Sequence, residues 1–252
     1  MQEDYQADIK EQTETPVRLN KYLAQAGICS RREADRLIEE GKVLVDGRTA
    51  QAGIKVLPGQ KIMVDGCPVE KEEQRILLAF YKPRGVVCTT DKRWGDTTVA
   101  DVLQYPKRVF YVGRLDKDSE GLLLMTNDGD LQNAIMKASN GHEKEYQVEV
   151  DGPIGETFLK KMRSGVFLKE LDVTTRPCRI KRTGRAKFTI ILTQGQIRRM
   201  CETCGRKVIS LKRVRVMNIT LDGLMPGEYR AVTQEEFVQL EKMLKKNKTR
   251  SS

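Results

Sequence analysis

The sequence predicts an α+β fold: a small domain of two helices and a short sheet, followed by a larger domain built on a mixed, mostly antiparallel sheet. Two features of the chain indicate this class. Near its start, apolar residues recur twice at helical spacing, and short β-branched runs follow them. Further on, strand and helix patterns mix without the strict alternation typical of a doubly wound parallel sheet. A length of 252 residues suits one large domain or two unequal ones.

The first domain is expected at residues 17–66. Its first helix is predicted where Leu19 to Ala26 place apolar side chains on one face, with Gly27 ending it. A second helix begins at the capping box formed by Ser30 and Glu33 and ends at Gly41. Short strands follow at residues 43–45 and 61–64, each closed by an Asp-Gly turn.

The second domain is expected at residues 76–244, after a short charged linker at residues 67–75. Its strands are predicted at residues 76–80, 109–112, 122–126, 146–150, 188–193 and 211–219. Its helices are predicted at residues 130–138, 157–162, 197–204 and 233–244, the last begun by a capping box at Thr233 and Glu236. The acidic leader at residues 1–16 and the basic tail at residues 245–252 are expected to be disordered.

Basic residues outnumber acidic ones, and they gather in one segment. The chain holds 45 Lys+Arg against 35 Asp+Glu, a net charge of +10. Residues 176–215 alone carry thirteen basic side chains and one acidic side chain, or +12. A run of charge is often only a solvated face. Here basic residues are interleaved with strand-forming ones, as in LKRVRVMNI, which favours a basic sheet face and makes nucleic acid the leading partner.

The sequence also bears on location. No run approaches the roughly 18 apolar residues that a membrane-spanning helix needs. The first sixteen residues are polar and mainly acidic, unlike a secretory or transit peptide. We therefore expect a cytoplasmic protein that does not bind a membrane.

Six cysteines are present, and one close pair, Cys201 and Cys204, has the spacing of a zinc or redox pair. No second close pair exists, and His142 is the only histidine. We expect reduced thiols, ordinary helix packing for the pair and no metal site. His142 is expected in a loop or at the surface, without a catalytic role.

A short polar loop between two apolar strands is the main candidate for chemistry. It runs from Gly113 to Gly121, and its flanks VFYV and LLLMT are typical of buried strands. Loops held by buried strands position reactive side chains rigidly. Asp116 lies between cations at Arg114 and Lys117, which favours an ionised carboxylate. A plain strand-to-strand turn is the alternative interpretation.

The first domain resembles a known RNA-binding module. The pattern RLNKYLAQAGICSRREADRLIEEGKVLVDG, continued by GQKIMVDG, is similar to the S4 domain over nearly its whole length. The resemblance implies a small module that binds structured RNA through its shape and its phosphates. The basic residues expected to contact RNA are Arg18, Lys21, Arg31, Arg32 and Lys42.

The second domain resembles the RNA pseudouridine synthases, in the form that modifies single ribosomal RNA uridines. The stretch VGRLDKDSEGLLLMTNDGDL carries this resemblance, and FYKPRGVV, HEKEY and QIRRMC agree with it in the expected order. With the S4 pattern, the similarity covers about residues 17–240. The stretches HEKEYQVEVDGPI and RVRVMNITLDG are most similar to the large-subunit enzymes of the F type.

This resemblance implies roles for four residues. Asp116 is the catalytic aspartate, and Arg114 belongs to the loop that holds it. Tyr146 stacks on the target base, and Arg198 pairs with the catalytic carboxylate. Moving the ribose bond from N1 to C5 of one uracil involves no net redox change and no phosphate energy, so no cofactor is expected.

The resemblance further implies ribosomal RNA as the partner, most closely a uridine of the 23S rRNA. We expect additional RNA contacts from Lys82, Arg84, Arg199, Lys212, Arg213 and Arg215. A monomer is expected because no heptad seam is apparent.

One departure from the family pattern keeps other functions open. The connection before Gln196 is a few residues shorter than usual, and the lost stretch would supply an RNA-facing arginine and set the helix that delivers Arg198. One alternative is therefore a catalytically impaired assembly factor that binds ribosomal RNA without turnover. Others are a synthase that acts on 16S rRNA or on transfer RNA.

Overall fold

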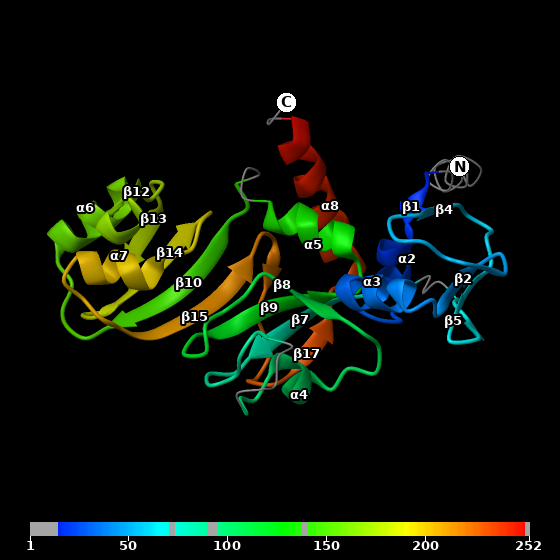
Figure 1. The fold of residues 1–252 in the computed structure, drawn as a ribbon. Helices are drawn as coiled ribbons and strands as arrows, with labels where there is room; N and C mark the ends of the chain where they lie inside the picture. The colour runs from blue at the N-terminus through cyan, green and yellow to red at the C-terminus, as the bar shows by residue number, and fades with distance from the viewer. Residues whose placement is uncertain (1–14, 71–73, 90–94, 138–140, 250–252) are drawn as a thin grey trace, which may run out of the picture. The chain divides into compact units, whose positions relative to one another are not determined.

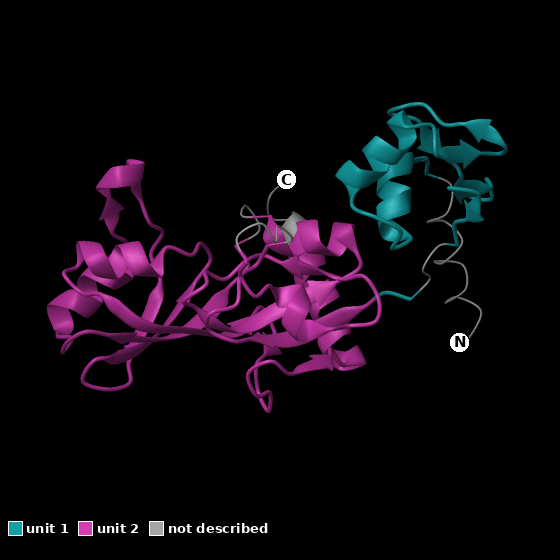
Figure 2. Ribbon diagram, turned by 60° about the horizontal axis from the view of Figure 1, so that its bottom comes forward, with its two compact units in different colours: residues 1–75 teal, residues 76–252 magenta. Residues whose placement is uncertain are grey.

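A computed structural model of the chain describes residues 15–70, 74–89, 95–137 and 141–249 (Figure 1). Two compact units are distinguished by their internal contacts, residues 1–75 and residues 76–252 (Figure 2). The division falls at Ile76, where the sequence predicts the start of the second domain. The predicted acidic leader lies outside the described residues except for positions 15 and 16.

Unit 1 contains both predicted helices and both predicted strands. α2 (Leu19–Gln25) packs against α3 (Arg31–Glu39), and Ser30 Oγ accepts a hydrogen bond from the backbone N–H of Glu33 at 3.1 Å. The main sheet has the order β3 (Arg48–Thr49), β2 (Val43–Val45), β5 (Ile62–Val64) and β6 (Cys67–Pro68). β1 (Val17–Arg18) pairs with β4 (Lys55–Val56). Because β6 pairs with β5, the predicted domain end at residue 66 is too early.

Unit 2 is built on one large sheet. Its strand order is β13 (Arg179–Arg182), β14 (Lys187–Leu192), β10 (Lys144–Val150), β15 (Val208–Val216), β9 (Glu120–Thr126), β7 (Leu77–Lys82) and β17 (Tyr229–Ala231). β8 (Phe110–Val112) also pairs with β9, and β16 (Ile219–Thr220) with β15. The β15–β9 pairing is parallel, and the other pairings of these strands are antiparallel. The mixed, mostly antiparallel α+β sheet predicted from the sequence is confirmed.

Helices cover this sheet in two groups (Figure 1). α6 (Glu156–Ser164) and α7 (Ile197–Thr203) cover one face of β10, β13 and β14 through a core that includes Met162, Phe188 and Met200. α5 (Gly129–Met136) and α8 (Gln234–Thr249) pack near β7 and β9 through Leu122, Ile135 and Leu240. α4 (Val99–Leu103) packs against the opposite face of β7, on Phe80 and Leu78.

Three groups of short elements differ from the prediction. α4 is absent from the prediction because it is short, although Thr98 and Asp101 form a capping box that marks its start. β13 and β17 are also absent, since both are short, and β13 is rich in charge. The hairpin of β11 (Phe167–Leu168) and β12 (Val173–Thr174) encloses a 3-10 turn at Lys169–Leu171.

The C-terminal tail is the clearest correction. α8 continues to Thr249, so the prediction of a disordered tail from residue 245 is wrong for residues 245–249. The run KKNKT contains no proline or glycine, and it simply continues the helix that precedes it. Among the described residues, no helix combines the length and apolar character that crossing a bilayer would take.

Candidate active site

The loop at residues 113–119 is held between β8 and β9 by three cationic side chains. Lys82 Nζ donates to the backbone oxygen of Ser119 at 2.7 Å. Arg213 Nη1 donates to the backbone oxygen of Arg114 at 3.4 Å. Arg198 Nη2 donates to the backbone oxygen of Asp118 and to Ser119 Oγ, both at 3.1 Å. Because both ends of the loop are anchored through backbone atoms, the side chains between them are held in a defined place.

Asp116 projects from this loop into a cleft of about 410 Å³. Its Oδ2 lies 3.7 Å from Nε of Arg198, which α7 supplies. The Asp116 side chain is 74% exposed, so this ion pair contributes less than about 1 kcal/mol to stability. The effect of the pair is therefore to orient the carboxylate. Tyr146, from β10, lines the same cleft and is only 6% exposed.

The cleft brings together five of the residues that the sequence analysis singles out. They are Arg114, Asp116, Tyr146, Arg198 and Arg199. They come from the loop before β9, from β10 and from α7, segments far apart in the chain. The short connection before Gln196 leads directly into α7, and Arg198 still reaches Asp116.

Two basic residues predicted to contact RNA are instead buried. Lys82 has no exposed surface and Arg213 only 2%. Both side chains donate further hydrogen bonds to backbone oxygens. Lys82 donates to the oxygen of Pro83, and Arg213 Nε donates to the oxygen of Leu122. The prediction that these two side chains meet RNA is wrong. Burial lowers the pKa of Lys82, whereas Cys88, Asp116 and Glu120 nearby act to raise it.

Two more predicted RNA contacts on β15 are engaged within the protein. Arg215 binds Glu145 at 2.9 Å and lies 3.6 Å from Glu143, and its Nη1 donates to the backbone oxygen of Met217. Lys212 Nζ lies 4.8 Å from the centre of the Tyr81 ring. These partners neutralise or shield both charges, so β15 does not present the bare basic face expected from its sequence.

The second cation expected beside Asp116 turns away from it. Lys117 Nζ binds Asp96 at 2.7 Å, and this contact raises the pKa of Lys117. The backbone N–H of Gly85 donates to the Lys117 oxygen at 2.8 Å, which places the exposed Arg84 turn next to the loop. Arg84 therefore remains a candidate for contact with RNA near the cleft.

In unit 1, the predicted RNA-contacting residues differ in how far their charge is available. Arg18, Arg31 and Arg32 are exposed, and Lys21 is half-buried. Lys42 is exposed but pairs with Glu40 at 2.7 Å, which raises the pKa of Lys42. Arg31 and Arg32, at the start of α3, are the most available adjacent pair among these residues.

Two polar residues of the site are missed by sequence reasoning. Ser119 is fully buried and joins the loop to Arg198. Gln196 lines the cleft at the start of α7. Neither residue type stands out as reactive. The available signal was their position inside the two motifs that carry the family resemblance.

The cysteine pair belongs to the core around α7. Cys201 is buried, and burial raises its pKa to about 12. Burial also raises the pKa of Cys204. Within the described residues, no group of three or more His, Cys, Asp or Glu side chains is placed to hold a metal ion. His142 lies in a loop, which is one of the two positions expected for it, but it is buried and not at the surface, and its Nε2 lies 3.1 Å from the backbone oxygen of Ala134.

Comparisons with known proteins agree with this geometry. The family model for RNA pseudouridylate synthase matches residues 76–203, and the S4 domain model matches residues 17–73. The dual-specificity RNA pseudouridine synthase RluF of Escherichia coli strain K12 is 47% identical over 236 residues, 92% of this chain and 80% of that protein.

Two further relatives extend the comparison. The ribosomal large subunit pseudouridine synthase B of Bacillus subtilis strain 168 is 37% identical over 232 residues, 88% of this chain and 95% of that protein. A solved structure of a pseudouridylate synthase superposes with a TM-score of 0.66 at 27% identity, covering 89% of this chain and 99% of that one.

The fold and the matches place this chain among RNA-modifying enzymes that carry an S4 RNA-binding domain. Within that class, the chain belongs to the RNA pseudouridine synthase family, which isomerises uridine in RNA to pseudouridine. The resemblance found in the sequence is thereby confirmed.

Proposed function

We propose that this enzyme isomerises a uridine of ribosomal RNA, in the large subunit, with Asp116 as the group that attacks the nucleoside. The observation that carries the proposal is the placement of Asp116, 3.7 Å from Arg198, in one cleft with Tyr146. The relative from Bacillus subtilis is named for the large ribosomal subunit, and the one from Escherichia coli is named as acting on RNA with dual specificity. Such a substrate would place the enzyme in the cytoplasm.

The reaction sets three demands on the site. The bond from ribose C1′ to N1 breaks with its electron pair going to the base, a bond from C1′ to C5 forms, and the C5 proton leaves while N1 gains one. A carboxylate meets the first demand by attack at C1′ or C6, or by assisting elimination to a glycal. Each route needs the Asp116 carboxylate on a fixed trajectory, and Arg198 and the anchored loop hold it in place.

The base must leave its stack to reach the cleft, at an unstacking cost of a few kcal/mol. Stacking on an aromatic ring is worth about 1–3 kcal/mol, so Tyr146 would offset much of that cost. Arg114 and Arg199 lie at the same cleft and would meet the flanking phosphates. The residues assigned to the reaction all come from one chain, so we propose a monomer as the working form, without a cofactor.

The test is a change of one carboxylate with its neighbour as the control. Asp116→Asn should lower the single-turnover rate on large-subunit rRNA fragments by roughly 10⁴-fold or more, as loss of a nucleophile does in other enzymes. Asp118→Asn should leave the rate within about threefold, because only its backbone oxygen contacts Arg198. Pseudouridine is mapped by carbodiimide-blocked reverse transcription.

Three results would count against the proposal. If the wild-type protein binds the rRNA tightly and forms no pseudouridine, it is a binding factor and not an enzyme on that RNA. Modification of small-subunit or transfer RNA alone would contradict the proposed substrate. Full activity of the Asp116→Asn protein would remove Asp116 from the chemistry.

A further inference from the structure

One residue that lines the cleft carries a buried polar atom without a hydrogen-bond partner among the described residues. Gln196 Oε1 is buried and accepts no hydrogen bond within the part of the chain that the structure describes. The residue begins α7, but its side chain does not cap that helix, and only its backbone oxygen is used, by the N–H of Met200 at 2.9 Å. Leaving a buried acceptor without a hydrogen bond destabilises a protein. Such a group in a substrate cleft is best explained by a donor that the substrate brings.

Two other side-chain acceptors in this cleft already face Arg198. The Asp116 carboxylate faces Arg198, and Ser119 Oγ accepts from Arg198 Nη2. Gln196 Oε1 is a buried neutral acceptor on a residue that lines the cleft, and it lacks a donor among the described residues. Uracil offers one ring N–H that is not consumed in the reaction, at N3.

The geometry of the isomerisation selects this N–H. For C5 to replace N1 beside the ribose, the uracil ring makes a half-turn about the axis through C6 and N3. That turn exchanges N1 with C5 and O2 with O4, whereas the N3–H group stays on the axis. An acceptor placed at N3–H keeps its hydrogen bond before and after the turn. A donor beside it meets a carbonyl oxygen in both orientations.

We propose that the Gln196 carboxamide binds the imide edge of the target uracil, with Oε1 accepting from N3–H, and so acts as the pivot on which the detached base turns. The inference rests on the proposed function, because it places the target uridine in the Asp116 cleft. It assigns Gln196 a role in recognising uracil and in retaining it while it is free of the ribose.

The test compares two target nucleotides in a protein that does not turn over. In the Asp116→Asn background, competition binding gives the Kd of RNA fragments that differ only in uridine or N3-methyluridine at the target. Gln196→Met is close in size and removes the acceptor. Gln194→Met is the matched control, since Gln194 is exposed in the same short connection. The preference for uridine should fall about tenfold in the Gln196→Met protein and stay unchanged in the control.

The outcomes separate this inference from a merely structural role. If Gln196 only shapes the start of α7, its replacement weakens both RNAs equally, and an unchanged preference overturns the proposal. If 2′-deoxyuridine at the target, and not N3-methyluridine, loses its penalty in the Gln196→Met protein, the oxygen binds the ribose and the assignment to N3 is wrong.

The two proposals also fail in different ways. Failure of the proposed function appears as absence of pseudouridine from the wild-type protein, or as turnover by the Asp116→Asn protein. Failure of the Gln196 inference appears only in the ratio of the two Kd values, while wild-type activity remains.

Discussion

At the scale of single residues, Gly121 allows β9 to pack closely against β15 just after the loop at residues 113–119. It has φ of +105°, and a Cβ placed there would lie 2.2 Å from the backbone oxygen of Arg213. This approach is the parallel pairing of β9 with β15, in which Gly121 is opposite Arg213. Backbone cannot yield as a flexible side chain does, so a side chain at this position would push the two strands apart.

Gly121→Ala should therefore lower the free energy of unfolding by about 2–4 kcal/mol, from overlap added to backbone strain. Urea unfolding followed by circular dichroism measures it. Gly184→Ala is the control, because its Cβ would meet only side-chain atoms of Lys187, at 3.4 Å or more, which is an ordinary contact. An equal decrease in the free energy of unfolding for the two variants would show that β9 and β15 do not approach closely at Gly121.

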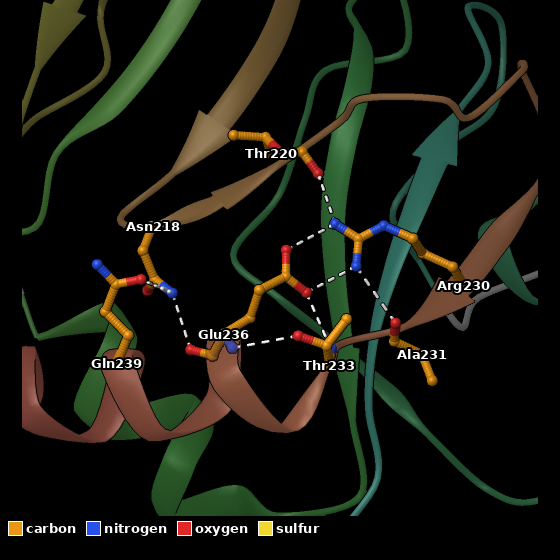
Figure 3. A network of polar contacts seen from close by, with 7 residues as sticks. All are labelled: Asn218, Thr220, Arg230, Ala231, Thr233, Glu236 and Gln239. Atoms are coloured by element: carbon orange, nitrogen blue, oxygen red, sulfur yellow. Dashed lines mark hydrogen bonds and ion pairs between the residues drawn. The ribbon is translucent and has the colours of Figure 1, made fainter.

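At the scale of elements, α8 is fixed to the sheet by a polar network at its first turn (Figure 3). Arg230 on β17 makes two hydrogen bonds with the Glu236 carboxylate, at 2.7 and 2.8 Å. Thr233 and Glu236 form the predicted capping box, at 2.9 and 3.2 Å. Asn218 Nδ2 donates to the backbone oxygen of Glu236 at 2.8 Å. One carboxylate thus joins the helix cap to the edge strand of the sheet.

Glu236→Gln should lower the free energy of unfolding by about 2 kcal/mol near neutral pH, since a partly buried charged hydrogen bond is lost. The Arg230 contact holds the pKa of Glu236 below its usual 4.5. A depressed pKa adds stability above the unfolded-state value and loses it as the pH falls through the folded-state value.

The difference between wild type and Glu236→Gln should therefore shrink as urea unfolding is repeated at pH values below 4.5. Glu235→Gln serves as the comparison, because Glu235 is exposed on the same turn and its pKa is lowered by hydrogen bonds with its own backbone and with Thr233, not by Arg230, so its effect on stability should be smaller. A difference that stays constant down to acid pH would mean that the ion pair does not form in solution.

β15 shows what the sequence could and could not predict. Its strand character follows from LKRVRV, but the strand alternation puts Arg213 on the same face as Leu211, toward the buried core. Sequence reasoning treats every arginine there as a surface charge, because charged residues are seldom buried. The carbonyl oxygens that accept from Arg213, on Leu122 and Arg114, come from segments about a hundred residues away. No pattern in the neighbouring sequence indicates hydrogen-bond acceptors so far away in the chain.

Some residues of the cleft at Asp116 could be predicted from the sequence, and others could not. Asp116, Tyr146 and Arg198 lie in motifs that a family resemblance can match, and the structure places them around one cleft. Ser119 and Gln196 lie in the same motifs, but the burial of Ser119 and the unpaired oxygen of Gln196 depend on the three-dimensional structure and cannot be read from the sequence. Lys117 shows the converse: its neighbour in sequence is Asp116, but its partner in space is Asp96.

At the scale of the whole molecule, the net charge of +10 does not say which cations meet RNA. Several basic side chains of unit 2 are buried or paired, whereas α3 in unit 1 presents Arg31 and Arg32 exposed at its start. Arg36 on the same helix is also exposed, but it pairs with Glu33 and Glu40, and these contacts raise its pKa. Arg31, Arg32 and Arg36 are thus all exposed on one helix, but the charge of Arg36 is compensated by two glutamates.

This contrast predicts the salt dependence of RNA binding. Replacing both Arg31 and Arg32 by alanine should reduce the slope of log K against log salt by about 1.4 to 1.8, because each phosphate contact contributes about 0.7 to 0.9. Arg36→Ala should change the slope much less, since the Arg36 side chain already forms ion pairs with two glutamates. Titrations of structured rRNA fragments over a range of salt measure both. A slope left unchanged by the double replacement would exclude the start of α3 from the RNA interface. If Arg36→Ala reduced the slope equally, the two glutamates would not be compensating the charge of Arg36.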